Sequence, residues 1–238
     1  MRKVVVIGAT SGIGKGLAKK FAEKGCLVGV TGRRRELLEE LKKERPESYM
    51  ISAFDITDTI SAIEALNDLT SKLGGLDLLI ICAGTGDMNT RLDFEIEKRI
   101  IETNVIGFTN IVDWGFNYFE NQKSGQLVAI SSIGGLRGSR HAPSYNASKS
   151  YQMNYLEGLR QKSKFIKSSI SITDIRPGLV DTDMAKGDSL FWVEPVQKVT
   201  NQIFKAIEKR KNVVYITKRW GIIARILKLM PRFLYDRM

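Results

Sequence analysis

Two side chains that could together move a proton lie four residues apart, in a segment whose pattern predicts a helix. Tyr145 and Lys149 would project from the same face of that helix. An isolated tyrosine, with a pKa near ~10, exchanges protons poorly at neutral pH, whereas a neighbouring ammonium favours its phenolate form. Such a pair could act as acid or base while a hydride moves to or from a carbonyl carbon. Because this spacing is equally typical of a surface pair, the elements around it must distinguish the two interpretations.

Strand and helix patterns alternate along most of the 238 residues. The predicted strands are residues 3–7, 27–31, 49–54, 76–81, 126–131, 170–175 and 212–216. The predicted helices are residues 13–24, 35–44, 57–73, 95–119, 144–162 and 196–210. Because most of the strands are apolar almost throughout, they should be covered on both faces. The pattern predicts a single-domain, Rossmann-like α/β fold: a doubly wound parallel sheet of about seven strands with helices on both faces.

A glycine-rich turn, Gly8-Ala-Thr-Ser-Gly12-Ile-Gly14, follows the first predicted strand directly and precedes the first helix. Glycines permit a tight turn and a close approach of ligand, and the free amides of the following helix attract phosphate. The pyrophosphate of a dinucleotide would fit there. The alternative is an ordinary glycine-rich turn, which the position after the opening strand of an α/β alternation disfavours.

This turn and five further motifs resemble the short-chain dehydrogenase/reductase family. The five motifs are Cys82-Ala-Gly84, Asn104, Ser131-Ser132, Tyr145-Asn-Ala-Ser-Lys149 and Arg176-Pro-Gly178. All six follow the family's order and together cover nearly the whole chain. Two positions depart from the family pattern, because Ile7 replaces the usual threonine and Cys82 the usual asparagine. These changes put in doubt a hydrogen bond that braces the sheet near the cofactor in the family.

The resemblance implies a catalytic group of Ser132, Tyr145, Lys149 and Asn104. In that group Ser132 would bind the substrate oxygen and Lys149 the nicotinamide ribose. Asn104 would hold a water that links Lys149 to solvent. The residues implied in cofactor binding are Gly8, Thr10, Ser11, Gly12, Ile13, Gly14, Arg33, Arg34, Asp55, Ile56, Ala83, Gly84, Tyr145, Lys149, Pro177, Gly178, Val180 and Thr182.

The end of the second predicted strand bears on the choice of nicotinamide cofactor. An acidic residue there would accept hydrogen bonds from a free ribose 2′-hydroxyl, but the chain reads Thr31-Gly32-Arg33-Arg34-Arg35. Guanidinium groups suit a 2′-phosphate, so NADP(H) is expected in preference to NAD(H). Arg33 is the first candidate for that contact and Arg34 the second, while Arg35 reads as the solvated start of a helix. No Cys/His cluster has metal-ligand spacing, so no metal is expected.

The segment from Thr182 to about Pro195 corresponds to the family's lid over the substrate. Its apolar side chains predict a rather apolar carbonyl or secondary alcohol, such as a 3-oxo lipid, although they could equally pack the lid against the domain. These side chains are Met184, Leu190, Phe191 and Trp192, with Gly86, Asp87 and Met88 as candidates for the opposite wall.

Residues 218–238 differ from residues 1–217, which we treat as one domain. They predict a basic amphipathic helix, interrupted at Pro231, with too many charges to span a bilayer. Such a segment could lie on an anionic membrane surface, or pack on its own domain or on another subunit. The single acidic residue, Asp236, stands against six cations: Lys218, Arg219, Arg225, Lys228, Arg232 and Arg237.

The formal net charge of +11 raises the possibility of a nucleic-acid partner, but no recognisable motif or basic stripe with stacking aromatics supports one. The N-terminus does not resemble a signal peptide, and Cys26 and Cys82 fall in separate strands, so we expect a cytoplasmic protein without a disulfide. The family resemblance implies a homo-oligomer. A catalytically quiet NADP(H)-binding regulator is the alternative function, which the presence of Ser132, Tyr145 and Lys149 disfavours.

Overall fold

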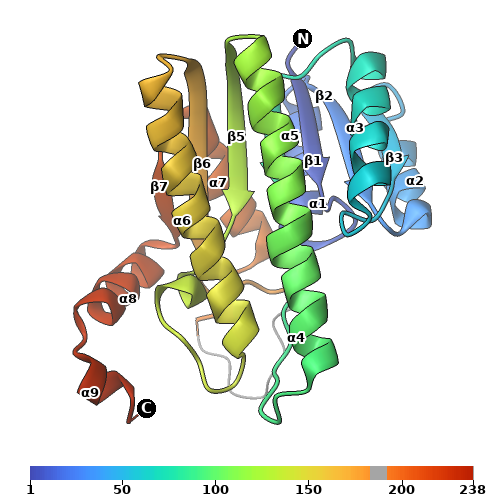
Figure 1. The fold of residues 1–238 in the computed structure, drawn as a ribbon. Helices are drawn as coiled ribbons and strands as arrows, with labels where there is room; N and C mark the ends of the chain where they lie inside the picture. The colour runs from blue at the N-terminus through green and yellow to red at the C-terminus, as the bar shows by residue number, and fades with distance from the viewer. Residues whose placement is uncertain (183–191, 238) are drawn as a thin grey trace.

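Seven parallel strands form the centre of the molecule, as the sequence predicts (Figure 1). The computed structural model describes residues 1–182 and 192–237. Neighbouring strands follow the order β3-β2-β1-β4-β5-β6-β7, so the winding direction reverses between β1 and β4, where such sheets bind ligands. The strands are β1 (Lys3–Ile7), β2 (Leu27–Gly32), β3 (Tyr49–Ala53), β4 (Leu78–Ile81), β5 (Ser124–Ile130), β6 (Ser169–Pro177) and β7 (Val213–Ile216).

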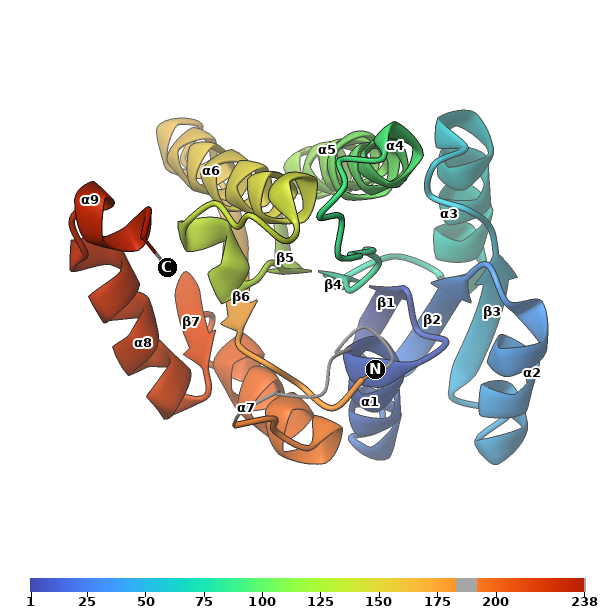
Figure 2. The same cartoon turned by 90° about the horizontal axis from the view of Figure 1, so that it is seen from below.

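Helices cover both faces of this sheet, and the alternation of side chains along β1 explains why (Figure 2). Val4 and Val6 point into one buried cluster, which α1, α2 and α7 complete. Val5 and Ile7 point into a second cluster beneath α3, α5 and α6. The helices are α1 (Gly12–Glu23), α2 (Arg35–Glu44), α3 (Thr59–Leu73), α4 (Phe94–Ile101), α5 (Phe108–Asn121), α6 (Pro143–Phe165) and α7 (Val196–Glu208).

The predicted helix over residues 95–119 is present as a continuous helical run over residues 94–121, but its middle turn is not an α-helix. Between α4 and α5 the backbone widens into a π-helical segment, Glu102–Gly107, that contains Asn104. Gly107 lies against the carbonyl of Ile56 so closely that a Cβ there would come within 2.7 Å of its oxygen. The apolar period of the segment is almost unchanged by one wider turn, so it does not reveal the π-helix. Such segments are frequent at functional sites.

The chain ends in two helices that follow β7, α8 (Lys218–Leu229) and α9 (Arg232–Tyr235). Pro231 separates them, as predicted. Trp220 and Ala224 of α8 are buried against the domain. Of the helices in residues 1–182 and 192–237, none is both long and apolar enough to cross a membrane.

Candidate active site

The glycine-rich turn lies at the carboxyl ends of β1 and β4, next to the point where the strand order reverses. Gly8 has a φ of 84°, which a residue with a side chain rarely adopts, and a Cβ there would lie 2.7 Å from the Ala83 nitrogen. The Ile7 carbonyl accepts hydrogen bonds from the amides of Cys82 at 2.8 Å and Ala83 at 2.9 Å. Main-chain hydrogen bonds therefore join the ends of β1 and β4 at Ile7 and Cys82, the two positions that depart from the family pattern.

The turn leads into the N-terminus of α1, where unpaired amides could bind phosphate. Ser11 is the N-cap residue of α1 but makes no side-chain capping bond, so its side chain does not occupy those amides. A Cβ on Gly12 would lie 3.1 Å from the methyl of Thr182, and one on Gly14 would overlap the Gly8 carbonyl. Thr182 thus lies beside the predicted pyrophosphate loop. The narrow glycine cradle and the uncapped helix end fit a dinucleotide.

Two arginines, Arg33 and Arg34, flank this cradle. The Arg34 guanidinium donates to the hydroxyls of Thr10 at 2.8 Å and Ser11 at 3.1 Å, so it lies directly on the loop. The side chain of Arg33 is 74% exposed, with Nη1 3.4 Å from the carboxylate of Asp55. Arg34 is therefore the arginine in contact with the turn, and Arg33 lies on its outer side with Asp55. Arg35 instead pairs with a glutamate one turn along α2, as expected of a solvated helix start.

Four further predicted cofactor contacts differ in their surroundings. Ile56 is buried in the core beside α3 and α5, so its side chain packs inside the fold. Pro177 ends β6, and the Gly178 amide that follows it donates to the Ile216 carbonyl at 2.8 Å. Val180 is 6% exposed and bridges to Glu194. Pro177, Gly178 and Val180 therefore form a fixed segment that leads from β6 to Thr182.

The predicted catalytic residues are brought together at the start of α6, which has Pro143 as its first residue. The Lys149 ammonium lies 5.9 Å from the centre of the Tyr145 ring. The Ser132 hydroxyl accepts the Gly134 amide at 3.0 Å, which leaves its proton available. Burial raises the pKa of Tyr145, and a hydrogen bond with Ser132 partly offsets that effect. Neither cause involves Lys149, and the lowering of this pKa by Lys149 stays a prediction.

Lys149 is 5% exposed, so its ammonium is largely removed from solvent. Burial lowers the pKa of Lys149 to about 8. The negative charge of Asp174, and to a smaller extent Cys82, raises this pKa and so offsets part of the effect of burial. The Lys149 ammonium donates to the Ile130 carbonyl at 3.1 Å and to Gln152 Oε1 at 3.0 Å. A lysine that titrates so close to neutrality can respond to a change of charge on a neighbouring phenol.

Gln152 is a site residue that the sequence analysis missed. While its Oε1 accepts from Lys149, its Nε2 donates to the Asn104 carbonyl at 2.9 Å. A direct amide bridge thus joins the Asn104 carbonyl to Lys149, and Gln152 is 1% exposed. The water between Asn104 and Lys149 stays a prediction. The Asn104 side chain bonds instead to the main chain of Thr85, at 2.9 and 2.7 Å. A polar residue three positions after Lys149, on the buried face of the same helix, was the available signal.

A buried ion pair on β6 was missed as well. Asp174 is fully buried and accepts from Ser131 Oγ at 2.5 Å and from Arg176 Nε at 2.6 Å. Arg176 also donates to the hydroxyl of Tyr215 at 3.0 Å. The pair thus ties β5, β6 and β7 together directly below the Ser132 loop.

The walls of the predicted substrate site are partly described. Gly86 lies against Tyr145, because a Cβ there would come within 2.6 Å of its ring. Asp87 forms an ion pair with Arg99 at 2.8 Å, whereas Met88 is 67% exposed. Trp192 makes an edge contact with the Trp220 ring. Met184, Leu190 and Phe191 lie outside the described residues.

The ends of the predicted lid are held next to each other. The Asp181 amide donates to the Glu194 carbonyl at 3.0 Å, and the Glu194 amide donates to the Leu179 carbonyl at 3.1 Å.

His141 lies in the loop that precedes α6, where its carbonyl accepts a hydrogen bond from the Asn89 amide at 2.6 Å. Within residues 1–182 and 192–237, no group of His, Cys, Asp and Glu side chains could hold a metal ion.

Comparison with known proteins agrees with this geometry. The family described as short chain dehydrogenase matches residues 2–190. An uncharacterized oxidoreductase of Myxococcus xanthus is 30% identical over 99% of this chain and 95% of its own length. A Dictyostelium discoideum protein named dehydrogenase/reductase SDR family protein 7-like is 28% identical over 92% and 71%.

Solved structures share the fold. Serine dehydrogenase from Escherichia coli superposes with a TM-score of 0.78 at 24% identity, covering 90% of this chain and 96% of that one. The closed form of a serine dehydrogenase complexed with NADP+ gives a TM-score of 0.81 at 24% identity, over 90% and 94%. On the family match, which spans most of its length, the chain belongs to the short-chain dehydrogenase/reductase family of nicotinamide-dependent oxidoreductases.

Proposed function

We propose that this protein is an NADP(H)-dependent oxidoreductase that transfers a hydride between the nicotinamide and a carbonyl or secondary alcohol. The observation that carries the proposal is that Ser132, Tyr145 and Lys149 lie together next to the glycine cradle. A Cβ on Gly84 would lie 3.5 Å from the Lys149 ammonium, and the neighbouring Ala83 packs against Gly8 of the cradle. When bound, the cofactor supplies or accepts the hydride.

In the direction of reduction, the Ser132 hydroxyl donates a hydrogen bond to the substrate oxygen and so stabilises its developing negative charge. Tyr145 transfers its phenolic proton to that oxygen as the carbon accepts the hydride, leaving a phenolate and an alcohol. The Lys149 ammonium lowers the energy of the phenolate. Gln152 holds the ammonium in place from below. In the direction of oxidation the phenolate takes the alcohol proton back.

The preference for NADP(H) rests on the two arginines beside the cradle. Arg34 bonds to Thr10 and Ser11, and Arg33 lies next to it with an exposed guanidinium, so both can turn to a 2′-phosphate. Titration of the protein with NADPH and NADH, followed by cofactor fluorescence, tests this preference. We expect tighter binding of NADPH, and a loss of that difference in Arg34→Ala. Equal affinities in the wild-type protein would overturn the assignment.

The substrate is proposed to be rather apolar, such as a 3-oxo lipid or a similar ketone. Met88 and Trp192, at the described edges of the site, expose 67% and 49% of their surface. Oxidation of NADPH should be screened over ketones, quinones, sugars and long-chain 3-oxo lipids. We expect turnover with the apolar carbonyls. Binding of NADPH without turnover of any carbonyl would favour the alternative, a catalytically quiet NADP(H)-binding regulator.

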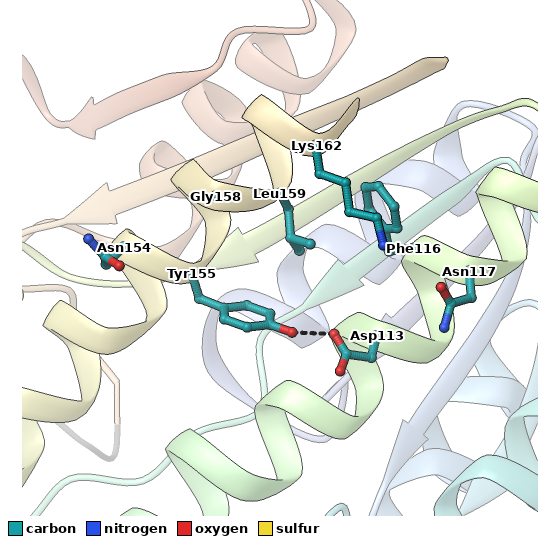
Figure 3. A pocket seen from close by; sticks show the side chains of 8 residues that line it. All are labelled: Asp113, Phe116, Asn117, Asn154, Tyr155, Gly158, Leu159 and Lys162. Carbon is teal, nitrogen blue, oxygen red and sulfur yellow. Dashed lines mark hydrogen bonds between the residues drawn. The ribbon is translucent and has the colours of Figure 1, made fainter. Parts of the chain in front are cut away.

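A homo-oligomer is also proposed, with the outer face of α5 and α6 as its subunit contact. Figure 3 shows a hollow on this face, where the Tyr155 hydroxyl donates to Asp113. Phe116 and Tyr155 line the hollow, and Tyr155 stacks on Tyr151. Aromatic side chains are enriched at interfaces. Light scattering of the purified protein should give more than one subunit, and a monomer at micromolar concentration would contradict the proposal.

We further propose the cytoplasm as the compartment, with contact to a membrane surface through residues 218–238. Cys26 and Cys82 are free thiols, which suits a reducing environment.

A further inference from the structure

The apolar sector of α8 is wider than its contact with the domain. Trp220 and Ala224 are buried against the domain, whereas Ile222, Ile226 and Leu229 expose 59%, 53% and 83% of their surface. These three residues follow one another at spacings of four and three, so they form one stripe along the helix. We call Ile222, Ile226 and Leu229 the apolar stripe. Its exposure is unusual for isoleucine and leucine so closely spaced on a folded domain.

The apolar stripe continues into α9, where Phe233 and Leu234 are 64% and 47% exposed. In Figures 1 and 2 both helices lie beyond the carboxyl ends of the strands, on the side of the molecule that carries the active site. The start of α4, where Phe94 is 69% exposed, lies on this side too. The exposed apolar residues of α8, α9 and α4 therefore lie on the side of the molecule that carries the active site.

Positive charge borders this surface. Residues 218–238 carry six cations and one acidic residue, so they account for a net charge of +5 out of +11. A groove along α7 and β7 adds further lysines beside Lys218 and Arg219, at the start of α8; these are Lys198, Lys205, Lys209 and Lys211. An apolar stripe with a basic border matches the boundary between acyl chains and anionic headgroups.

The orientation of α8 is fixed by specific contacts with the active-site loops. Arg137, five residues after Ser132, donates to the carbonyls of Leu227 and Met230 at the end of the helix. The Tyr235 hydroxyl donates to the Gly138 carbonyl at 2.5 Å. Trp220 fills the space beside Gly178, where a Cβ would come within 2.1 Å of its ring. The stripe thus faces outward because the opposite side of the helix is tied down.

A second copy of the chain suits this stripe less well than a lipid surface. In a two-fold contact through α8, each subunit would present the same surface, so the cations that border one stripe would meet the same cations of the other. Anionic headgroups would instead neutralise them. Charge complementarity therefore distinguishes the two occupants.

We propose that α8 and α9 dock this protein on the surface of an anionic lipid bilayer, with the apolar stripe at the boundary of headgroups and acyl chains. Docking of this kind turns the side of the molecule that carries the active site toward the bilayer. It does not depend on the reaction proposed above, because adsorption needs no turnover.

Sedimentation of the full-length protein with vesicles tests the proposal. The vesicles are of phosphatidylcholine alone or of phosphatidylcholine with one third phosphatidylglycerol, at low and at high salt. We expect binding to the anionic vesicles, and weaker binding in high salt. Leu229→Glu should lower the partition coefficient by about tenfold or more, because it places a charge in the stripe.

Phe165→Glu is the matched control, since Phe165 is 87% exposed at the far end of α6 and the change of charge is the same. Arg225→Gln with Arg232→Gln should weaken binding, and Lys164→Gln with Lys167→Gln, at equally exposed positions, should weaken it less. Equal effects of Leu229→Glu and Phe165→Glu would overturn the proposal. Failure of the wild-type protein to bind either kind of vesicle would overturn it too. If, in addition, Leu229→Glu separated the subunits of an oligomer, the apolar stripe would be identified as a subunit contact.

Discussion

The buried ammonium of Lys149 should make the stability of this protein rise with pH over a defined window. Its pKa is about 8 in the folded protein against an ordinary 10.5, because burial disfavours the charged form. The unfolded chain therefore binds more protons than the folded protein between these two values, and the free energy of unfolding increases with pH. At about 1.4 kcal/mol per pKa unit, the whole difference corresponds to about 3 kcal/mol, most of it between pH 7 and pH 10.

Urea denaturation of the wild-type protein and of Lys149→Met, at several pH values from 7 to 10, isolates this contribution. All other groups titrate in both proteins, so they cancel in the difference between the two free energies of unfolding. We expect that difference to change in favour of the wild type by about 2 to 3 kcal/mol from pH 7 to pH 10. Its absolute value includes the lost hydrogen bonds to Ile130 and Gln152, but its slope does not. A difference that stays constant over this range would refute the reasoning.

Substitutions at two further positions, Gln152 and Gly178, test other parts of the site. Gln152→Leu removes an acceptor of the Lys149 ammonium and should move the alkaline limb of kcat/KM for NADPH down by about one to two pH units, whereas Gln152→Glu should move it up. Gln126→Leu is the control, because Gln126 is an equally buried glutamine far from the site. If the alkaline limb moved in the same direction in both Gln152 variants, the proposed bridge from Lys149 through Gln152 to Asn104 would be contradicted. Gly178→Ala should lower the free energy of unfolding, measured by urea denaturation, by about 1–3 kcal/mol, because the new Cβ would clash with Trp220. If the effects of Gly178→Ala and Trp220→Ala were additive in the double variant, that clash would be disproved.

Much of the fold could be predicted because its determinants are local. The strands of a doubly wound sheet are apolar on both faces, so each appears as a short hydrophobic run between helical patterns. The π-helical turn around Asn104 could not be predicted, because one wider turn leaves the apolar period of the segment almost unchanged, and its contact between Gly107 and Ile56 joins two segments far apart in sequence. The two sides of α8 were equally hidden, since a helical wheel shows a broad apolar sector but not which part of it is covered.

Motif spacing located the candidate catalytic group, since Ser132, Tyr145 and Lys149 do lie together. It did not reveal what supports the group. Gln152 and Asp174 belong to no motif, and their importance depends on burial and on partners from other elements. The contacts of Arg34 with Thr10 and Ser11, and of Arg33 with Asp55, likewise join segments far apart in sequence, which residue types do not specify.

The most direct test of the proposed chemistry compares Tyr145→Phe with Tyr151→Phe. Both tyrosines lie on α6, but the Tyr151 hydroxyl lies 2.8 Å from the hydroxyl of Thr109, away from the site. NADPH binding should be unchanged in both variants. Oxidation of NADPH by a carbonyl substrate should fall by about 10² to 10⁴ in Tyr145→Phe alone, since only that variant lacks the proton donor. Turnover at the wild-type rate in Tyr145→Phe would contradict the central claim.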